Sequence, residues 1–186
     1  MMIIGITGTI GAGKGTIVDY LVDQFHFKHF SVRQFLIEEA IKRGMPLNRD
    51  TYVALANELR AQNSPSYITD QLYQEAIQTG GNAVIESIRT PGEIDSLCKN
   101  DHFFLLAVDA DPHLRYERIV LRNSETDQIT FETFLENEKR EMTASDPNKQ
   151  NLSECIRRAH FVIRNDHDIP TLYENLEKII QDHLTK

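Results

Sequence analysis

A glycine-rich stretch with a single lysine, from Gly8 to Thr16, has the residue types that bind a polyphosphate. Its glycines let the backbone turn tightly enough for several N–H groups to converge on one anion. Lys14 adds a mobile positive charge that can follow the terminal phosphates of a triphosphate. An apolar run precedes the stretch and a helical pattern follows it, so a helix N-terminus faces the same point. We therefore predict a phosphate-binding loop (P-loop) with contacts from Gly8, Gly11, Ala12, Gly13, Lys14, Gly15 and Thr16.

The metal ligands of this site are expected to be Thr16 and Glu86. The residue after the P-loop lysine usually carries a hydroxyl that holds Mg²⁺, but here it is Gly15, and the first hydroxyl belongs to Thr16. Glu86 ends a short apolar run at 83–85, which predicts a strand beside the P-loop strand. At that point a carboxylate can order a metal through water or accept the proton of an attacking hydroxyl. Asp109 and Asp111 rank lower, because Asp111 before a proline is more simply a helix cap.

Arginines are the second group of candidates, because phosphoryl transfer requires charge to be neutralised on the moving group. Arg89 follows Glu86 closely and is expected to reach the phosphate of an acceptor. Arg118 and Arg122 are expected to act as phosphate clamps, whereas Arg115 on the same helix is expected to face solvent. Arg140 is a further candidate for binding substrate, in a helix whose glutamates offer it surface pairing instead.

The elements that must position these residues alternate between strand and helix. Strands are predicted at residues 3–6, 27–31, 83–85, 103–108 and 160–164, and helices at 17–22, 32–42, 50–61, 67–78, from 91, 112–122, 130–142 and after 168. In the helix predicted at 50–61, Tyr52, Val53, Ala56 and Leu59 are expected to face inward. This alternation predicts an α/β fold, with a parallel sheet covered on both faces and ligands at the carboxyl ends of the strands.

Length, charge and cysteine content limit the possible classes of protein. A chain of 186 residues suits one domain, and a net charge of −8 argues against a general nucleic-acid surface. No apolar run is long enough to span a bilayer, and the N-terminus reads as a strand rather than a signal. Cys98, Cys155 and the histidines have no metal-ligand spacing, so we expect free thiols, a cytoplasmic location and no zinc site. The oligomeric state is expected to be a monomer or a homodimer.

Four segments together resemble the P-loop nucleoside monophosphate kinases and their relatives, the dephospho-CoA kinases: residues 5–16, 85–89, 117–122 and 159–165. Residues 57–60, 87–89 and 138–141 are particularly similar to an uncharacterised archaeal branch of these kinases. The resemblance implies a three-layer fold with a five-stranded sheet of order 2-3-1-4-5, an acceptor-binding helical region at about 32–80 and a short helical lid at about 122–150. It also implies ATP and Mg²⁺.

Residue roles carry over from the same resemblance. It implies that Glu86 lies near the metal, that Arg89 binds the acceptor phosphate, and that Arg118 and Arg122 are lid-hinge arginines. It also implies that adenine packs near Asn165. The chain departs from adenylate kinases at Ile37, where they carry a phosphate-binding arginine, and Arg33 is the candidate to compensate. It departs from dephospho-CoA kinases at Gly15, where they keep a hydroxyl residue.

The resulting hypothesis is an ATP- and Mg²⁺-dependent kinase acting on a nucleotide-like acceptor, with a nucleoside or deoxynucleoside monophosphate first and dephospho-CoA second. Two other classes stay open. One is a regulatory module that binds a nucleotide without turnover, which would need the P-loop but not the arginines. The other is an ATPase that acts on a partner protein.

Overall fold

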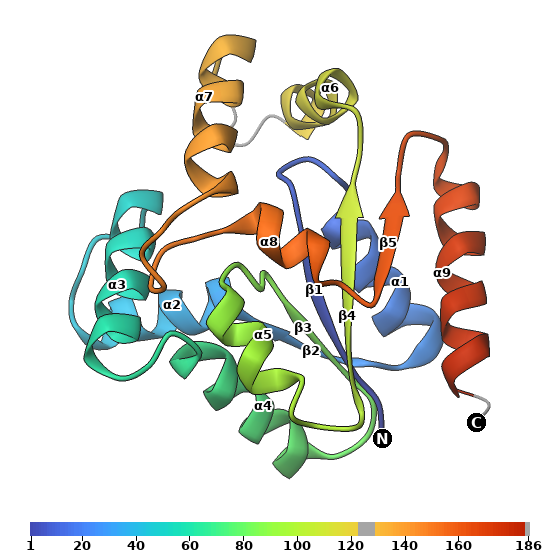
Figure 1. Ribbon diagram of the computed structural model, residues 1–186, viewed down its shortest axis with the longest axis horizontal. Helices are drawn as coiled ribbons and strands as arrows, with labels where there is room; N and C mark the ends of the chain where they lie inside the picture. The colour runs from blue at the N-terminus through green and yellow to red at the C-terminus, as the bar shows by residue number, and fades with distance from the viewer. Residues whose placement is uncertain (123–128, 185–186) are drawn as a thin grey trace.

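A five-stranded parallel sheet forms the centre of the computed structural model, which describes residues 1–122 and 129–184 (Figure 1). Its strands are β1 (Ile3–Gly8), β2 (Lys28–Ser31), β3 (Ala83–Glu86), β4 (Phe103–Asp109) and β5 (Phe161–Arg164), in the order β2-β3-β1-β4-β5. Ile6 of β1 pairs with Glu86 of β3, and Gly8 pairs with Val108 of β4. The predicted α/β class and the sheet order are therefore confirmed.

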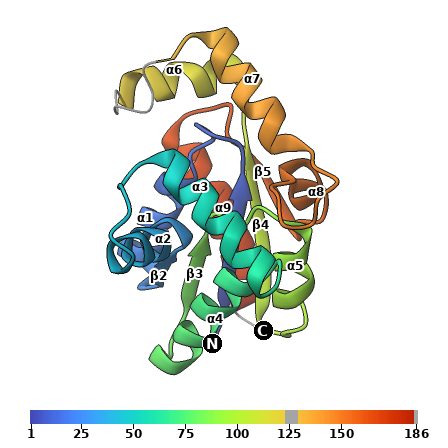
Figure 2. The ribbon, with the colours of Figure 1, turned by 90° about the vertical axis from the view of Figure 1, so that its left-hand side faces the viewer.

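The sheet has a hydrophobic core on each face, which is why its central strands read as continuous apolar runs. Every residue of β1 is buried. One core gathers Ile17 of α1 (Lys14–Phe25) and Leu176 of α9 (Ile169–Leu184), and the other gathers residues of α2 to α5 and Cys155 of α8. Figure 2 shows α1 on one side of the strands and α5 and α8 on the other. None of the helices in the described ranges combines the length and apolarity needed to cross a bilayer.

The remaining helices begin at side-chain caps, with one exception. They are α2 (Val32–Lys42), α3 (Arg49–Gln62), α4 (Tyr67–Thr79), α5 (Pro91–Leu97), α6 (Pro112–Arg122), α7 (Phe131–Met142) and α8 (Leu152–Arg157). The exception is α4, whose N-cap residue Ser66 makes no capping hydrogen bond. Thr90 and Glu93 form a capping box at α5, and Asp111 accepts from the backbone N–H of His113 at 2.9 Å. Asp111 is thus the helix cap that its place before a proline predicts.

Two helical details differ from expectation. Val53 of α3 is 39 % exposed, whereas Leu55 is fully buried, so the inward face predicted for this helix was wrong at Val53. The sequence pattern also gave no prediction of α8, because this helix is short and buries only Leu152 and Cys155. The sequence feature that indicates α8 is Asn151, an N-cap whose side chain accepts from the backbone N–H of Glu154.

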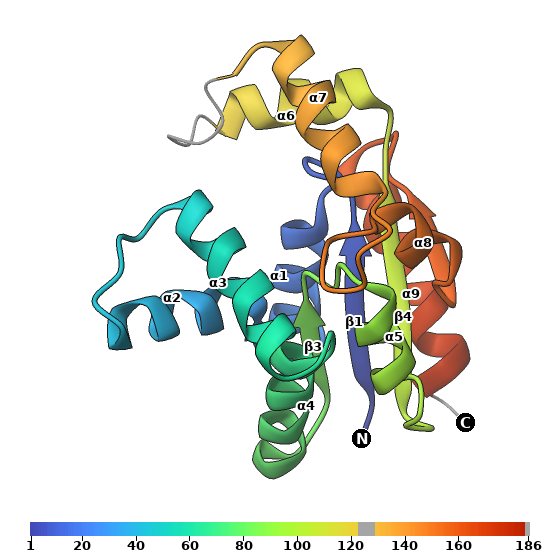
Figure 3. The ribbon, with the colours of Figure 1, turned by 60° about the vertical axis from the view of Figure 1, so that its left-hand side comes forward.

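Helices α6 and α7 lie beyond the carboxyl ends of the strands (Figure 3). They pack on each other through aromatic rings: His113 stacks on Phe131 at 4.5 Å between centroids, and Tyr116 meets the edge of Phe131 at 5.2 Å. The lid expected at about 122–150 includes residues 123–128, which lie outside the described residues, so its movement stays a prediction. Both helices nonetheless cover the end of the sheet where the P-loop begins.

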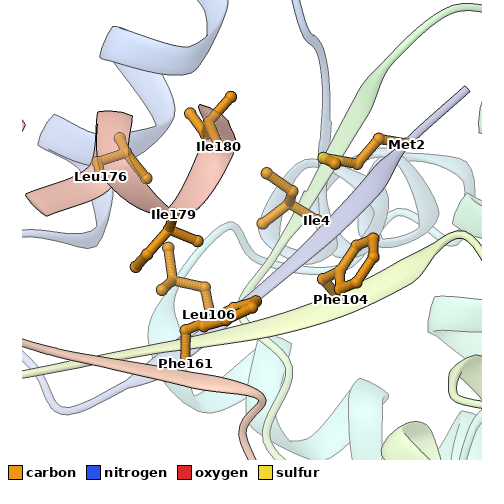
Figure 4. Close-up of a pocket in the computed structure, with 8 residues that line it drawn as sticks. All are labelled: Met2, Ile4, Phe104, Leu106, Phe161, Leu176, Ile179 and Ile180. Atoms are coloured by element: carbon orange, nitrogen blue, oxygen red, sulfur yellow. The ribbon is translucent and has the colours of Figure 1, made fainter. Parts of the chain in front are cut away.

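At the opposite end of the sheet, a small gap separates the strands from α9 (Figure 4). Only apolar side chains line it: Met2, Ile4, Phe104, Leu106, Phe161, Leu176, Ile179 and Ile180. Without a polar group to orient a ligand, this gap belongs to the packing of the core rather than to a binding site.

Candidate active site

The P-loop joins β1 to α1 in a conformation that requires three of its glycines. Gly8, Gly11 and Gly13 have φ angles of 137°, 76° and 99°. A Cβ on Gly8 would lie 2.0 Å from the carbonyl oxygen of Val108, and one on Gly11 would lie 2.5 Å from that of Arg115. A Cβ on Gly15, in contrast, would meet nothing within 4 Å. Backbone geometry thus explains Gly8, Gly11 and Gly13 but leaves Gly15 free to carry a side chain.

Lys14, the first residue of α1, bends its side chain back over this loop. Its ammonium group donates to the carbonyl oxygens of Gly8 at 2.9 Å and Thr9 at 2.7 Å. Desolvation of the ammonium lowers the pKa of Lys14 to about 7. A lysine so poorly solvated gains its charge readily when an anion is placed beside it.

Four charged residues from distant parts of the sequence act on the ammonium group of Lys14. Arg89 and Arg115 lower the pKa of Lys14, and Glu141 and Glu86 raise it. Electrostatic effects of this kind fall off with distance, so these four side chains supply much of the charge that Lys14 experiences. Glu86 and Arg89 were predicted at this site, whereas Arg115 and Glu141 were not.

Asn165, which follows β5, holds the P-loop in place through a side-chain hydrogen bond. Its side-chain Nδ2 donates to the carbonyl oxygen of Ala12 at 2.9 Å, and a Cβ on Gly13 would lie 2.4 Å from the same nitrogen. Thr9 is held from the neighbouring strand, since its hydroxyl donates to Asp109 at 2.7 Å. The contacts of Asn165 are with the loop itself, so its expected role beside adenine stays a prediction.

Replacing Asn165 with alanine should lower the free energy of unfolding by about 1–3 kcal/mol, because the buried carbonyl of Ala12 would lose its donor. Urea denaturation followed by circular dichroism measures the change. The same substitution at exposed Gln78 should change it by less than about 0.5 kcal/mol. Equal effects at the two positions would show that Asn165 does not brace the loop.

Arg118 on α6 points back toward the same loop region. Its Nη2 donates to the carbonyl oxygen of Asn165 at 2.9 Å, while its Nη1 is buried and has no hydrogen-bond partner among the described residues. A buried, unpartnered guanidinium nitrogen is costly unless an anion binds it. Arg122, at the exposed end of α6, borders residues outside the described part of the chain. Arg118 is thus placed beside the loop, whereas the clamp role of Arg122 stays a prediction.

The expectation that Arg115 faces solvent was wrong. Arg115 is only 3 % exposed, and its Nη1 donates to the carbonyl oxygen of Ile10 in the P-loop at 3.2 Å. Its Nη2 pairs with Glu138 of α7 at 2.7 Å, and its guanidinium lies over the ring of Phe134. Arg115 thus ties α6 and α7 to the P-loop.

Glu86 ends β3 next to β1, as predicted. Its Oε1 accepts from the hydroxyl of Ser31 at 2.7 Å and lies 3.5 Å from Nε2 of His29. The hydrogen bond from His29, aided by that from Ser31, lowers the pKa of Glu86 against the effect of partial burial. Glu86 is therefore ionised at neutral pH.

A pocket opens beside Glu86 at the edge strand β2. Its lining residues are His29, Ser31, Arg33, Gln34 and Ile37, so it includes the two partners of Glu86 and the predicted substrate-binding residue Arg33. The exposed residue Arg33 thus shares one cavity with the two side chains that contact Glu86, which was not predicted from sequence.

Arg89 makes its contacts with α7 and the segment after it. Nη1 of Arg89 donates to Glu141 at 3.2 Å and to Gln150 at 2.7 Å. Glu141 also accepts from Arg49, the first residue of α3, at 2.6 Å. Arg140, the predicted substrate-binding residue next to Glu141, is exposed on α7 instead.

A buried ion pair fixes the backbone of Arg89. Glu93 Oε2 accepts from the backbone N–H groups of Arg89 at 2.7 Å and Thr90 at 2.9 Å, and Glu93 Oε1 accepts from Arg60 at 3.0 Å. Sequence reasoning missed this pair, although Arg60 lies in the segment 57–60 that carried part of the family resemblance.

Among the described residues, no group of three or more His, Cys, Asp or Glu side chains could hold a metal. Mg²⁺ in phosphotransfer sites is usually bound through one or two carboxylates and the substrate phosphates, so Thr16 and Glu86 fit a shared site of this kind. Thr16 stands in the first turn of α1 and is partly exposed. The residues present are thus compatible with a metal that arrives with a nucleotide.

A family model described as an AAA domain matches residues 4–144. A UPF0200 protein from Methanococcus vannielii is 28 % identical over 184 residues, which cover 97 % of this chain and 96 % of that protein. The crystal structure of TT1252 from Thermus thermophilus superposes with a TM-score of 0.63 and 23 % identity, covering 98 % of this chain and 97 % of that one. Shikimate kinase from Bacteroides thetaiotaomicron superposes with a TM-score of 0.55 and 12 % identity, covering 97 % of each chain.

These likenesses confirm the resemblance stated from the sequence at the level of the fold. The chain has a P-loop kinase-like fold, and its relatives include the archaeal UPF0200 proteins.

Proposed function

The chain belongs to the AAA domain family, and from that premise we propose that it is a P-loop phosphotransferase that moves the γ-phosphoryl group of ATP to a small nucleotide-like acceptor. The observation that carries the proposal is the charge gathered around Lys14: Arg115 donates to the P-loop carbonyl of Ile10, and Glu86 ends the strand that pairs with β1. A protein that only bound a nucleotide would need the P-loop without this surrounding charge.

The donor triphosphate is proposed to lie on the backbone N–H groups of the P-loop, with Lys14 at its terminal phosphates. Lys14 would exchange its bonds to the carbonyls of Gly8 and Thr9 for bonds to phosphate oxygens. The unpartnered Nη1 of Arg118 supports this position, because a phosphate oxygen would give it a partner.

In the proposed transfer, an acceptor oxygen forms a bond to the γ-phosphorus while the bond from that phosphorus to the β–γ bridging oxygen breaks, which releases ADP. Mg²⁺ held by Thr16 and Glu86 would neutralise charge on the phosphates. If the acceptor oxygen belongs to a phosphate, no proton has to leave. Where it is a hydroxyl, its proton passes to Glu86 or to water. The lowered pKa of Glu86 favours the metal-orienting role, because a weakly basic carboxylate is a poor proton acceptor.

The acceptor is proposed to be a nucleoside or deoxynucleoside monophosphate, with Arg89 binding its phosphate and the pocket that Arg33 lines receiving another part of the molecule. Dephospho-CoA is the alternative, supported by the opening Ile-Thr-Gly-x-Ile-Gly at residues 6–11 and by Val-Ile-x-Asn at residues 162–165, and opposed by Gly15. We also propose that the protein acts in the cytoplasm, where ATP is available and where Cys98 and Cys155 would stay reduced.

A coupled assay of ADP release, run with each monophosphate and with dephospho-CoA, tests the proposed activity. Turnover that requires one acceptor supports the kinase, and the preferred acceptor distinguishes the two alternatives. Tight nucleotide binding without turnover would instead identify a regulatory module. Hydrolysis without any small acceptor, stimulated by a protein, would identify an ATPase.

Nucleotide binding should take up protons above neutral pH. At pH 8, Lys14 with its pKa of about 7 is mostly neutral, and a polyphosphate beside it restores the charge, so about one proton is bound per site. Affinity should accordingly fall as the pH rises from 7. Calorimetry of ADP binding in buffers of different ionisation enthalpy measures the uptake. Lys14→Arg, which stays protonated, should take up none. Equal uptake in both proteins would place the titration elsewhere.

A further inference from the structure

Three charged side chains from separate elements meet at the edge of the site. Arg49 begins α3, Arg89 follows β3, and Glu141 lies near the end of α7. The two oxygens of the Glu141 carboxylate are divided between the arginines: Oε1 accepts from Nη2 of Arg49 at 2.6 Å, and Oε2 accepts from Nη1 of Arg89 at 3.2 Å. The Glu141 side chain is only 15 % exposed. The arginines thus form a two-guanidinium cradle around one anion.

The charges in this cradle do not balance. Arg49 and Arg89 carry two positive charges, and Glu141 supplies one negative charge. A phosphate monoester brings about −1.5 to −2 charges and three acceptor oxygens, so it would match the two guanidinium groups more closely than a carboxylate does. Glu138, one turn before Glu141 on α7, pairs with Arg115, which donates to the P-loop carbonyl of Ile10, so the cradle lies near the phosphate-transfer site.

We propose that Arg49 and Arg89 form the subsite for the phosphate monoester of the acceptor, and that Glu141 occupies this subsite until the acceptor displaces it. That the bound anion is the acceptor rests on the proposed function. The anion site itself is argued from the contacts of Arg49, Arg89 and Glu141. Arg33, the arginine expected from the sequence to compensate at Ile37, lines the pocket beside Glu86 together with Ile37 and not the cradle.

Displacement has an energetic consequence. An incoming phosphate must first separate Glu141 from both arginines, so the affinity observed for the anion is lower than the affinity of the free cradle. Removing the charge of Glu141 should therefore strengthen anion binding. A purely structural role for Glu141 would leave anion affinity unchanged or weaken it.

The test uses Glu141→Gln and inorganic phosphate as the probe, with chloride added to keep ionic strength constant. The dissociation constant comes from the rise of the thermal unfolding midpoint with phosphate concentration, in full-length protein saturated with ADP and Mg²⁺. We expect phosphate to bind at least about tenfold more tightly to Glu141→Gln than to the wild type. Glu136→Gln makes the same charge change at an exposed position of α7 and should stay within about twofold.

Adding Arg49→Gln to Glu141→Gln should abolish the gain. An unchanged affinity in Glu141→Gln, or a gain that survives the loss of Arg49, overturns the inference. The wild type and the variants have the same P-loop. A difference in their phosphate affinity therefore reports on the cradle, whether or not ADP binds. Failure of the proposed function appears separately, as absent ADP release in the assay with acceptors.

Discussion

Replacing Arg60 with methionine should lower the free energy of unfolding by about 3–5 kcal/mol. Arg60 and Glu93 are 3 % and 0 % exposed, and Arg60 Nη2 donates to Glu93 Oε1 at 3.0 Å. Methionine fills a similar volume but leaves the carboxylate of Glu93 buried without a cation. Urea denaturation followed by circular dichroism measures the loss.

Two comparisons separate this effect from a general cost of removing arginine. Arg157→Met breaks an ion pair with Glu154 whose arginine is 70 % exposed, and it should cost less than about 1 kcal/mol. Arg60→Met with Glu93→Gln removes both charges and keeps an oxygen for the backbone of Arg89. This double variant should be more stable than Arg60→Met by at least about 1 kcal/mol. A double variant no more stable than the single one would contradict the role assigned to the buried charge.

The Arg60–Glu93 pair also connects stability to the site. Glu93 accepts from the backbone N–H of Arg89, so the pair holds the turn from which Arg89 reaches Glu141. Loss of Arg60 should therefore change the position of Arg89 even in protein that remains folded. Anion binding by Arg60→Met, measured as for Glu141→Gln, would report this displacement.

The parts of the fold that follow from local pattern could be predicted from sequence. The glycine spacing before Lys14 specifies a P-loop, because only a chain without Cβ atoms fits beneath the carbonyls of Val108 and Arg115. Apolar runs separated by helical patterns indicate a parallel sheet. The order of its strands came from the family resemblance, since periodicity carries no information on which strands are neighbours.

The partners of charged side chains could not be predicted in the same way. Arg49 and Glu141 are 92 positions apart in sequence, and Arg60 and Glu93 are 33 apart, so only the folded chain brings each pair together. The burial of Arg115, in contrast, could have been predicted from the sequence. Arg115 precedes buried Ile119 by one helical turn, which places both on the inner face of α6.

Helix α7 illustrates why a charged helix is hard to interpret from sequence. Its basic residues suggested contacts with substrate through Arg140, but the side chains that reach the site are Glu138 and Glu141. Arginines contributed by other elements, Arg115 and Arg89, attract these carboxylates. The charge that a helix presents to a site is thus set by what lies opposite it, which the helix sequence does not contain.

Replacing Lys14 with methionine should reduce kcat/KM for the acceptor by about 10²–10³-fold, the typical loss when one charge-stabilising donor is removed from a transfer site. The free energy of unfolding should change far less, because the lowered pKa of Lys14 makes its charge costly in the folded protein. The native pKa of about 7 lies below the unfolded value of 10.5, so the protonated lysine opposes folding below pH 7, and this cost fades as the pH rises toward 10.5.

Methionine removes that cost and also the bonds to the carbonyls of Gly8 and Thr9, and these two changes oppose each other. At pH 7 the variant should therefore unfold at nearly the same urea concentration as the wild type while losing turnover. Lys178→Met, at an exposed position of α9, should keep both turnover and stability. Retention of turnover within about fivefold in Lys14→Met would mean that charge from Arg118 and the loop amides is sufficient, and that Lys14 serves the fold of the loop instead.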